Sequence, residues 1–422
     1  MPSAVVVGGG IAGLVIAREL AIGGVSVTLL EASDRLGGKV ARHIVAGIEL
    51  DAGAESFATR NGTVAALATS LGLSVELPNP AGAWLQASPD RAFPLPKTGL
   101  LGIPSVPLAA DVIAAVGIGG ALRAQLDELM LGFVASQERN FGELVRRRMG
   151  RVVLEQLVAP VTLGIHSRHP NDLDVDVVAP GLRAALLDTG SLAHAVRTLR
   201  AAAPAGSAVS GVEGGIFELV DALADDLSAR GVDLRLSSPV GEVDALGATL
   251  TTGEIVDADT VVLATALAAP DQTTITPTTI TLATLVLDAP QLDGAPRGTG
   301  LLVVPGTEGI RAKALTHSSA KWRWLADRLG AHRHVIRLSY SGVSPEAWRE
   351  QARRDAEKLL GVEIAASSIQ GFDSVEWSQP ATAPPSIPGV TLVGEGVAGT
   401  GLAAVIGRAQ REAERLLGDS KP

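Results

Sequence analysis

The chain opens with an apolar run that leads straight into a glycine-rich turn, and this pairing constrains the fold more than any other feature. Residues 4–7 read Ala-Val-Val-Val and residues 8–13 read Gly-Gly-Gly-Ile-Ala-Gly. At this spacing the first glycine permits a tight turn, the second lets the backbone approach a pyrophosphate, and the third lets a helix pack on the sheet. A helix over 11–23 would point its N–H groups and positive dipole end at the phosphates. The opening therefore predicts a dinucleotide-binding βαβ unit.

An acidic residue stands at the end of the second expected strand. Residues 25–30 form this strand, and Glu31 follows them. A carboxylate at this point can accept hydrogen bonds from an adenosine ribose. Next come Gly37 and Gly38, whose backbone can wrap the inner face of a cofactor, and then the small residues 53–56, which allow close approach to a flat ring.

Composition excludes several classes of protein. The chain has 422 residues, enough for two or three domains, and 46% of them are hydrophobic, so a folded protein is expected. A net charge of −10 argues against a general nucleic-acid binder. Cysteine is absent, which excludes disulfides, thiolate metal sites and a cysteinyl–flavin link. Neither a transmembrane run nor a signal peptide is evident, so we expect a cytoplasmic protein, with peripheral membrane contact through residues 103–135 left open.

Secondary-structure patterns divide the chain into three predicted domains. A Rossmann-like domain comprises residues 1–80, 205–270 and 385–422, because a glycine pattern returns at 210–215 and a strand, glycine loop and helix close the chain. Residues 84–204 read mainly as helices broken by Pro and Gly. Residues 271–384 read mainly as strands, interrupted by one helix at 345–360. The predicted fold is thus α/β, with discontinuous segments, a helical insertion and a mainly antiparallel substrate domain.

The scatter of these segments indicates which dinucleotide is bound. Cofactor-like patterns stand at the start, in the middle and at the end of the chain, whereas a nicotinamide dehydrogenase normally has one contiguous cofactor domain. FAD fits this arrangement better than NAD. No second GxGxxG for NADPH is evident, so we expect dioxygen or another soluble electron acceptor.

The middle of the chain points to a family. The segments 145–150 (Val-Arg-Arg-Arg-Met-Gly) and 157–161 (Leu-Val-Ala-Pro-Val), together with Lys321-Trp322, resemble the FAD-dependent porphyrinogen oxidases within the amine-oxidase-like flavoproteins. Leu95-Pro96 and the run 101–104 are most similar to the bacterial coproporphyrinogen III oxidase branch. The resemblance implies oxidation of coproporphyrinogen III to coproporphyrin III in haem biosynthesis, with dioxygen reduced to peroxide. It also implies a contact with ferrochelatase.

Three alternatives remain open at this point. One is a protoporphyrinogen IX oxidase, another is a different amine-oxidase-like flavin oxidoreductase, and the third is a degenerate flavin- or porphyrin-binding protein. The third is suggested by the short segment between Trp377 and Pro388, where family members carry a longer loop. The sequence leaves the oligomeric state undetermined.

Site residues follow from the motifs and the resemblance together. The predicted cofactor-binding residues are Gly8, Gly9, Gly10, Ile11, Ala12, Gly13, Glu31, Arg35, Gly38, Lys39, Gly53, Ala54, Glu55, Ser56, Val240, Trp377, Thr400, Gly401 and Leu402. No catalytic residue is certain; Lys321 is a candidate that could act on the flavin N5 through a water. The propionates of the substrate call for a cationic partner, and the candidates are Lys97, Arg168, Lys313 and Arg337.

Two charged clusters have more than one interpretation. Arg146, Arg147, Arg148 and Arg151 form either a solvated helix face or a patch for an anionic substrate, lipid or protein. His332 and His334 alternate on an expected strand, but no carboxylate partner stands beside them in sequence, so no metal site is predicted.

Overall fold

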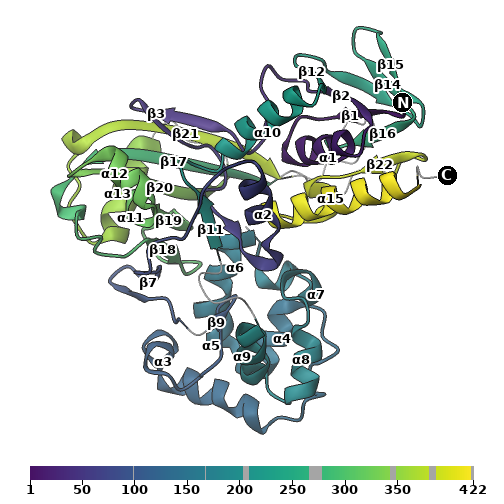
Figure 1. Cartoon of the computed structure of the whole chain (residues 1–422). Helices are drawn as coiled ribbons and strands as arrows, with labels where there is room; N and C mark the ends of the chain where they lie inside the picture. The colour runs from purple at the N-terminus through teal and green to yellow at the C-terminus, as the bar shows by residue number, and fades with distance from the viewer. Residues whose placement is uncertain are drawn as a thin grey trace. The chain divides into compact units, whose positions relative to one another are not determined.

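A computed structural model of the chain describes residues 1–97, 99–166, 168–202, 209–265, 278–342, 348–379 and 386–419. The chain divides into two compact units (Figure 1). Unit 1 comprises Met1–Pro78, Ser207–Ile280 and Val375–Pro422, and unit 2 comprises Asn79–Gly206 and Thr281–Ser374. Each unit is therefore assembled from segments that are distant in sequence.

Unit 1 is built on a five-stranded sheet in the order β12-β2-β1-β16-β22. All four pairings in this sheet are parallel. The chain passes from β1 to β2 on one side, whereas β16 lies on the other side of β1. The strand order thus reverses at β1, and in such sheets the ligand crevice lies at the carboxyl ends of the strands at this point. The strands are β1 (Ser3–Val7), β2 (Ser26–Leu30), β12 (Asp233–Arg235), β16 (Thr260–Leu263) and β22 (Val390–Leu392).

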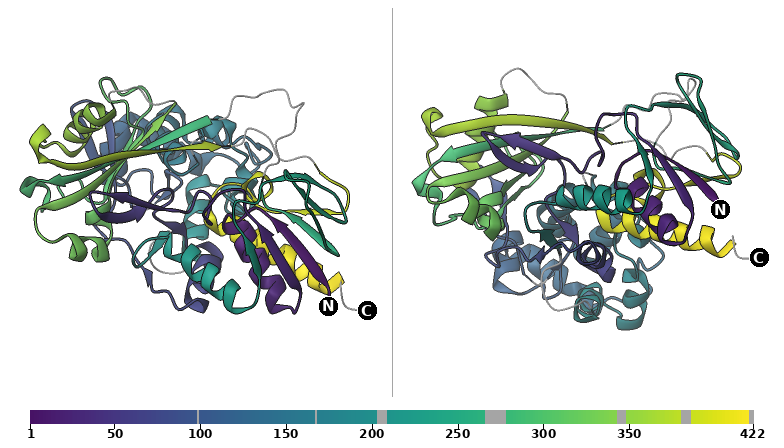
Figure 2. Two further views of the ribbon diagram at one scale, coloured as in Figure 1. Left: turned by 90° about the horizontal axis from the view of Figure 1, so that it is seen from above. Right: turned by 45° about the horizontal axis from the view of Figure 1, so that its top comes forward.

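Helices from three parts of the chain pack together beside this sheet. The helix α1 (Ile11–Ile22) contacts both α10 (Glu218–Ala229) and α15 (Leu402–Asp419), and Figure 2 shows the three lying near one another. Almost every side chain of α1 is buried, because the sheet covers one face and the two other helices cover most of the rest. Arg18 of α1 is nevertheless accommodated, since it donates to Asp226 of α10 at 2.8 Å.

The remaining elements of unit 1 are short. A hairpin, β3 (Arg42–Val45) with β4 (Ile48–Asp51), leads toward the helix α2 (Thr63–Ser70). A three-stranded antiparallel sheet consists of β13 (Val240–Val243), β14 (Gly247–Leu250) and β15 (Ile255–Asp257).

Unit 2 contains a seven-stranded sheet in the order β21-β17-β20-β19-β18-β7-β8. The helix α13 (Trp348–Leu360) covers a core that includes Tyr340 and Trp348, whose rings are 4.2 Å apart. The strands are β7 (Trp84–Ser88), β8 (Arg91–Pro94), β17 (Thr278–Asp288), β18 (Gly300–Val303), β19 (Ala314–His317), β20 (Arg333–Ser341) and β21 (Ile369–Gln379).

The other part of unit 2 is helical and has its own core. Its main helices are α3 (Ala110–Gln125), α4 (Phe141–Met149), α6 (Ala159–His166), α8 (Leu182–Thr189) and α9 (Leu192–Ala202). Within α3 the backbone kinks at Gly117, where φ is 72°. Gly117 therefore kinks α3 without ending it.

The predicted α/β fold class is confirmed, but one stretch of the helical segment was assigned wrongly. Residues 84–94 form β7 and β8 and not helix: the two strands pair antiparallel across a Pro-Asp turn, and β7 also pairs with β18 of the seven-stranded sheet. The predicted helix 345–360 is described from Trp348, since residues 343–347 lie outside the described part of the chain. The division into three separate domains stays a prediction.

Candidate cofactor site

The glycine turn after β1 has the geometry expected of a phosphate-binding loop. Gly8 has φ of 106°, which disfavours any residue with a side chain. A Cβ on Gly13 would lie 1.9 Å from the Gly8 carbonyl oxygen, so only glycine permits the helix to pack this close. By contrast, a Cβ on Gly10 would meet nothing within 4 Å. Gly10 therefore borders open space, where a ligand could approach the backbone.

The N-terminus of α1 is suited to an anion. Its N-cap residue, Gly10, makes no side-chain capping hydrogen bond, and its first turn contains no acidic residue. The first N–H groups of a helix have no partner within the helix, and its dipole places partial positive charge there. The turn and the helix together thus leave donors available for a pyrophosphate.

Glu31 is held in place by the backbone around it. One carboxylate oxygen, Oε2, accepts the N–H of Gly9 at 2.6 Å, and the other, Oε1, accepts the N–H and Oγ–H of Ser33 at 2.8 and 2.7 Å. A carboxylate offers about four lone-pair positions, so capacity remains for ribose hydroxyls. The Glu31 backbone also bonds Arg235 and Ser238, which brings the segment preceding Val240 beside it.

The loop after Glu31 returns to the glycine turn. Gly37 donates its N–H to the Gly9 carbonyl at 2.8 Å, and a Cβ on Gly38 would lie 3.5 Å from the Gly10 Cα. Arg35 stabilises this return, because its Nη1 donates to the Gly38 carbonyl at 3.2 Å. The structure thus brings both predicted glycine motifs together around Gly10.

A residue that the sequence did not single out, Glu395, lies in the same region. Lys39 Nζ forms an ion pair with Glu395 Oε2 at 2.7 Å, joining the loop after β2 to the end of the chain. Glu395 follows Gly394, where an added Cβ would lie 3.8 Å from the Ala12 Cβ in the first turn of α1. A Gly-Glu-Gly run at the end of a late strand was the available sequence signal. Its long-range partner could not be read from sequence.

The other predicted residues are distributed between exposed and structural positions. Thr400 and Gly401 are exposed immediately before α15, and Leu402 is buried against the helical core. A Cβ on Gly53 would lie 2.2 Å from the Lys39 carbonyl oxygen, so this glycine is required by packing. Trp377 donates its Nε1–H to the Ala52 carbonyl at 2.9 Å and thereby fixes the turn that precedes Gly53.

The second glycine pattern, at residues 210–215, has an internal carboxylate where the first would bind a phosphate. Asp51 accepts the N–H groups of Ile216 and Phe217 at 3.1 and 2.9 Å, close to the start of α10. Asp51 is buried, so its charge is compensated by these donors. This pattern therefore serves packing, which leaves α1 as the helix with the phosphate-type turn.

We expect Asp51→Ala to lower the free energy of unfolding by about 2–3 kcal/mol, because two buried N–H groups lose a charged acceptor. Urea denaturation followed by circular dichroism measures the change. Asp257→Ala, at an exposed position of unit 1, is the matched control and should change stability by less than about 0.5 kcal/mol. Equal effects of the two substitutions would contradict the assigned role of Asp51.

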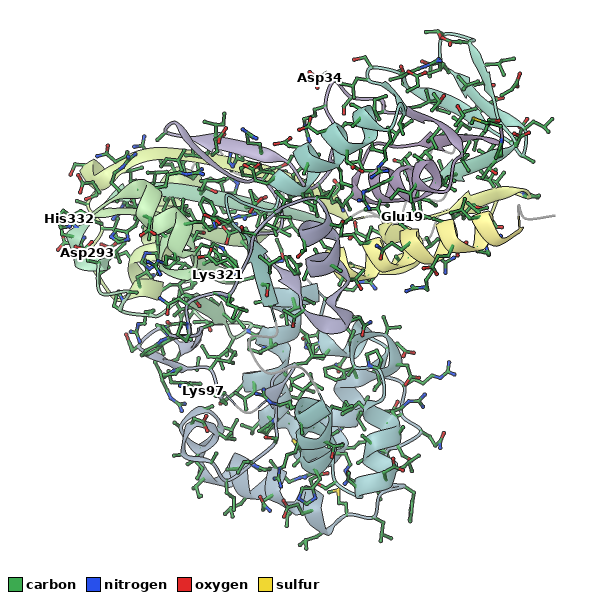
Figure 3. The ribbon with its side chains drawn as sticks, viewed as in Figure 1. Glu19, Asp34, Lys97, Asp293, Lys321 and His332 are labelled. Carbon is green, nitrogen blue, oxygen red and sulfur yellow. The ribbon has the colours of Figure 1, made fainter. Side chains whose placement is uncertain are left out.

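Unit 2 holds the remaining candidate residues. Lys321 ends the short helix α11 (Ser318–Lys321), with its Nζ 4.8 Å from the centre of the Trp322 ring; Figure 3 labels it. Its proposed role at the flavin stays a prediction. Of the propionate candidates, Lys97 and Arg168 are exposed, Lys313 is half-buried and Arg337 is buried in β20. Burial lowers the pKa of Lys313.

The basic cluster separates into two kinds of residue. Arg146, Arg147 and Arg151 are exposed and form ion pairs with Glu143, Glu138 and Glu155. Arg148 is fully buried and bonds Asp127. Both the solvated helix face and the anionic-ligand patch are therefore wrong for Arg148, which has a structural role.

The parallel sheet, its switch point and the open glycine turn define a dinucleotide-binding protein. Comparison with known proteins shows to which family of dinucleotide-binding proteins the chain belongs. Residues 11–291 match the family described as flavin-containing amine oxidoreductase, and the chain belongs to this family. Its cofactor is FAD, as predicted, and the open Gly10–Gly38 turn fits such a group.

The chain is also similar to individual named proteins. The chain is 32% identical to the coproporphyrinogen III oxidase of Mycobacterium leprae over 79% of this chain and 76% of that protein. It is 28% identical to the coproporphyrinogen III oxidase of Propionibacterium freudenreichii, over 62% and 56% of the two chains. A candidate protoporphyrinogen oxidase from Exiguobacterium sp. 255-15 has the same fold, with a TM-score of 0.81, 22% identity and 99% coverage of both chains.

Among the described residues, no helix is both long and apolar enough to cross a membrane. In the same part of the chain, no cluster of three or more potential ligands could hold a metal ion.

Proposed function

We propose that the protein is an FAD-dependent porphyrinogen oxidase that converts coproporphyrinogen III to coproporphyrin III, with dioxygen as the electron acceptor. The observation that carries this proposal is the similarity to coproporphyrinogen III oxidases over most of the chain. The family match extends over both units and supports an oxidoreductase independently of the substrate.

The residues around Gly10 would hold the dinucleotide part of FAD. In this proposal the α1 N-terminus and the Gly8–Gly13 turn bind the pyrophosphate, and Glu31 accepts the ribose hydroxyls. The Lys39–Glu395 pair keeps the loop after β2 and the end of β22 together on the same side of the sheet. When bound, FAD supplies two-electron oxidation of carbon centres, and the protein contributes binding, orientation and exclusion of water.

A carboxylated substrate requires a cation near its propionates. Arg337 is the candidate we favour, because a guanidinium keeps its charge when buried and binds carboxylates through two donors. Lys313 is less suited, since burial lowers its pKa and thus disfavours the charged form. Arg337→Lys keeps the positive charge but removes the two parallel donors of the guanidinium. We therefore expect the KM for coproporphyrinogen III to rise about tenfold while the flavin content stays unchanged. A KM within twofold of the wild type would remove Arg337 from the site.

Porphyrin fluorescence tests the function directly. The purified protein, loaded with FAD, is incubated in air with coproporphyrinogen III or protoporphyrinogen IX, and peroxide is measured in parallel. We expect faster porphyrin formation from coproporphyrinogen III, with three peroxides for each porphyrin. Faster porphyrin formation from protoporphyrinogen IX would indicate a protoporphyrinogen IX oxidase instead. No turnover with either substrate would overturn the proposal, and bound flavin that neither bleaches nor recovers would indicate a degenerate binding protein.

A peripheral membrane contact is a second proposal, and it concerns unit 2. Large apolar side chains are exposed along α3 and the segment that follows it: Ile118, Leu122, Leu126, Leu129, Leu131 and Phe133. Exposed apolar side chains grouped on one element are typical of interaction surfaces. Sedimentation with vesicles measures this contact, and Leu129→Glu with Phe133→Glu should abolish it. Contact with ferrochelatase stays a prediction.

A further inference from the structure

Four ionisable side chains form one hydrogen-bonded chain in unit 2, away from the dinucleotide residues in sequence. His332 Nδ1 lies 2.7 Å from Asp293 Oδ2, and Asp293 Oδ1 lies 3.1 Å from His334 Nε2. His334 Nδ1 then lies 3.0 Å from His317 Nε2. Figure 3 labels His332 and Asp293, which lie beside each other. Asp293 is the carboxylate partner that the sequence did not reveal.

This hydrogen-bonded series of side chains runs from solvent into the protein interior. The His332 side chain is 54% exposed and that of His334 only 10%, and His317 is completely buried. The elements that it joins are the turn after β17, the start of β20 and the end of β19. His317 also directly precedes α11 as its N-cap residue, although its side chain makes no capping hydrogen bond there.

One arrangement of protons satisfies this chain at neutral pH. The Asp293 carboxylate can only accept, so His332 Nδ1 and His334 Nε2 each donate to it. A neutral His334 then has an acceptor at Nδ1, and His317 Nε2–H donates to it. The remaining ring nitrogen, Nδ1 of His317, is buried and has no hydrogen-bond partner among the described residues. As an acceptor it tolerates this position better than an N–H would.

An additional proton disrupts the arrangement. A proton on His334 Nδ1 would face the N–H of His317, donor against donor. His317 could only respond by moving its own proton to Nδ1, where no acceptor is described. A proton on His317 itself would create a charge in a fully buried site. The buried end of this hydrogen-bonded series, formed by His334 and His317, therefore cannot take up a proton without losing a hydrogen bond or burying a charge.

We propose that His332, Asp293, His334 and His317 form an acid-sensitive lock that holds the 288–293 turn and the start of α11 to the sheet at neutral pH and releases them on acidification. The titratable groups around His334 are His317, which contacts it directly, and Asp293, His332 and Asp288 of β17, whose charges act on it. Of these, only the two carboxylates favour a charged His334.

The direction of the pKa changes agrees with this lock. Burial lowers the pKa of His317 to about 3, and burial is also the main reason that the pKa of His334 falls below its ordinary value. The unfolded chain therefore binds more protons than the folded chain below the ordinary histidine pKa of about 6.5. The stabilisation is present above that pH and is lost as the pH falls toward the folded values.

Hydrogen exchange measured by mass spectrometry at pH 7.5 and pH 5.0 tests the lock, with exchange corrected for its intrinsic pH dependence. We expect protection in peptides covering 286–295, 314–322 and 331–336 to fall at least ~10-fold at pH 5.0, while the unit 1 sheet changes less than ~2-fold. A uniform loss across the chain would overturn the proposal.

His317→Gln tests the contribution of the buried end of this hydrogen-bonded series. A glutamine amide can donate to His334 when that ring is neutral and can turn to accept from it when it is protonated, so this variant should lose the pH response. His194→Gln, at a partly exposed position of α9, is the control and should keep it. A His317→Gln variant with the full wild-type response would contradict the lock.

A measurement on the unmodified protein covers the case in which His317→Gln does not fold. Nitrogen-15 NMR of the imidazole rings should show His317 protonated at Nε2 and not titrating between pH 7.5 and 5.5. Titration of His317 near pH 6.5 without any change in exchange would overturn the proposal. The lock rests on unit 2 alone, so these outcomes are independent of the proposed oxidase function.

Discussion

Arg148→Met should lower the free energy of unfolding by about 3–5 kcal/mol, because it leaves a buried carboxylate without its cation. Arg148 and Asp127 are both fully buried. The Arg148 guanidinium also donates to the carbonyls of Leu131 at 3.0 Å and Gly190 at 2.7 Å. One side chain thus joins α4 to two loops of the helical core, and urea denaturation of the purified variant measures the loss.

The neighbouring arginine provides the control. Arg147→Met removes an exposed ion pair with Glu138 at 3.5 Å and should cost less than about 1 kcal/mol. Replacing both buried partners, Arg148→Met with Asp127→Leu, should recover part of the loss, although Ser191 and Ala193 then lose their acceptor. If Arg148→Met and Arg147→Met were equally stable, the buried network would not have the role assigned to it.

Gly10→Asp should reduce FAD affinity by on the order of 100-fold or more, about 3 kcal/mol, while leaving the apoprotein as stable as before. The backbone of Gly10, with φ of −71° and ψ of 174°, is one that any residue can adopt, and its Cβ position is open. Aspartate is a preferred N-cap residue, so its carboxylate would satisfy the first N–H groups of α1. The same carboxylate would compete with the pyrophosphate for those donors and repel it.

Flavin fluorescence titration of the apoprotein measures the affinity, and thermal unfolding measures the stability. Gly119→Asp makes the same chemical change at another glycine with open space, in α3 of unit 2, and should bind FAD normally. Normal FAD binding by Gly10→Asp would show that the pyrophosphate does not bind at this turn.

The predicted cofactor residues illustrate what a sequence can specify. Gly8 and Gly13 were predictable because each is required by a local constraint, a positive φ or a close approach, that only glycine meets. The position of Glu31 at the end of the second strand could be read from sequence, and its contact with a ribose stays a prediction. Residues 84–94 show the limit of such predictions: they lie in a segment predicted to be mainly helical but form strands, because short strands depend on pairing with a sheet built from distant residues, here β18.

The sequence by itself determined the dinucleotide-binding α/β unit, because turn geometry and hydrophobic periodicity are local properties of the chain. The spacing of the cofactor-like segments favoured a flavin, and the resemblance of the middle segments to known flavoproteins indicated the family. The tertiary structure alone decided the long-range partners of three carboxylates. Glu395 meets Lys39, Asp51 meets the start of α10, and Asp293 meets two histidines. These partners are far apart in sequence. Their meeting depends on strand order and helix packing, which bring distant segments together only once the core has formed.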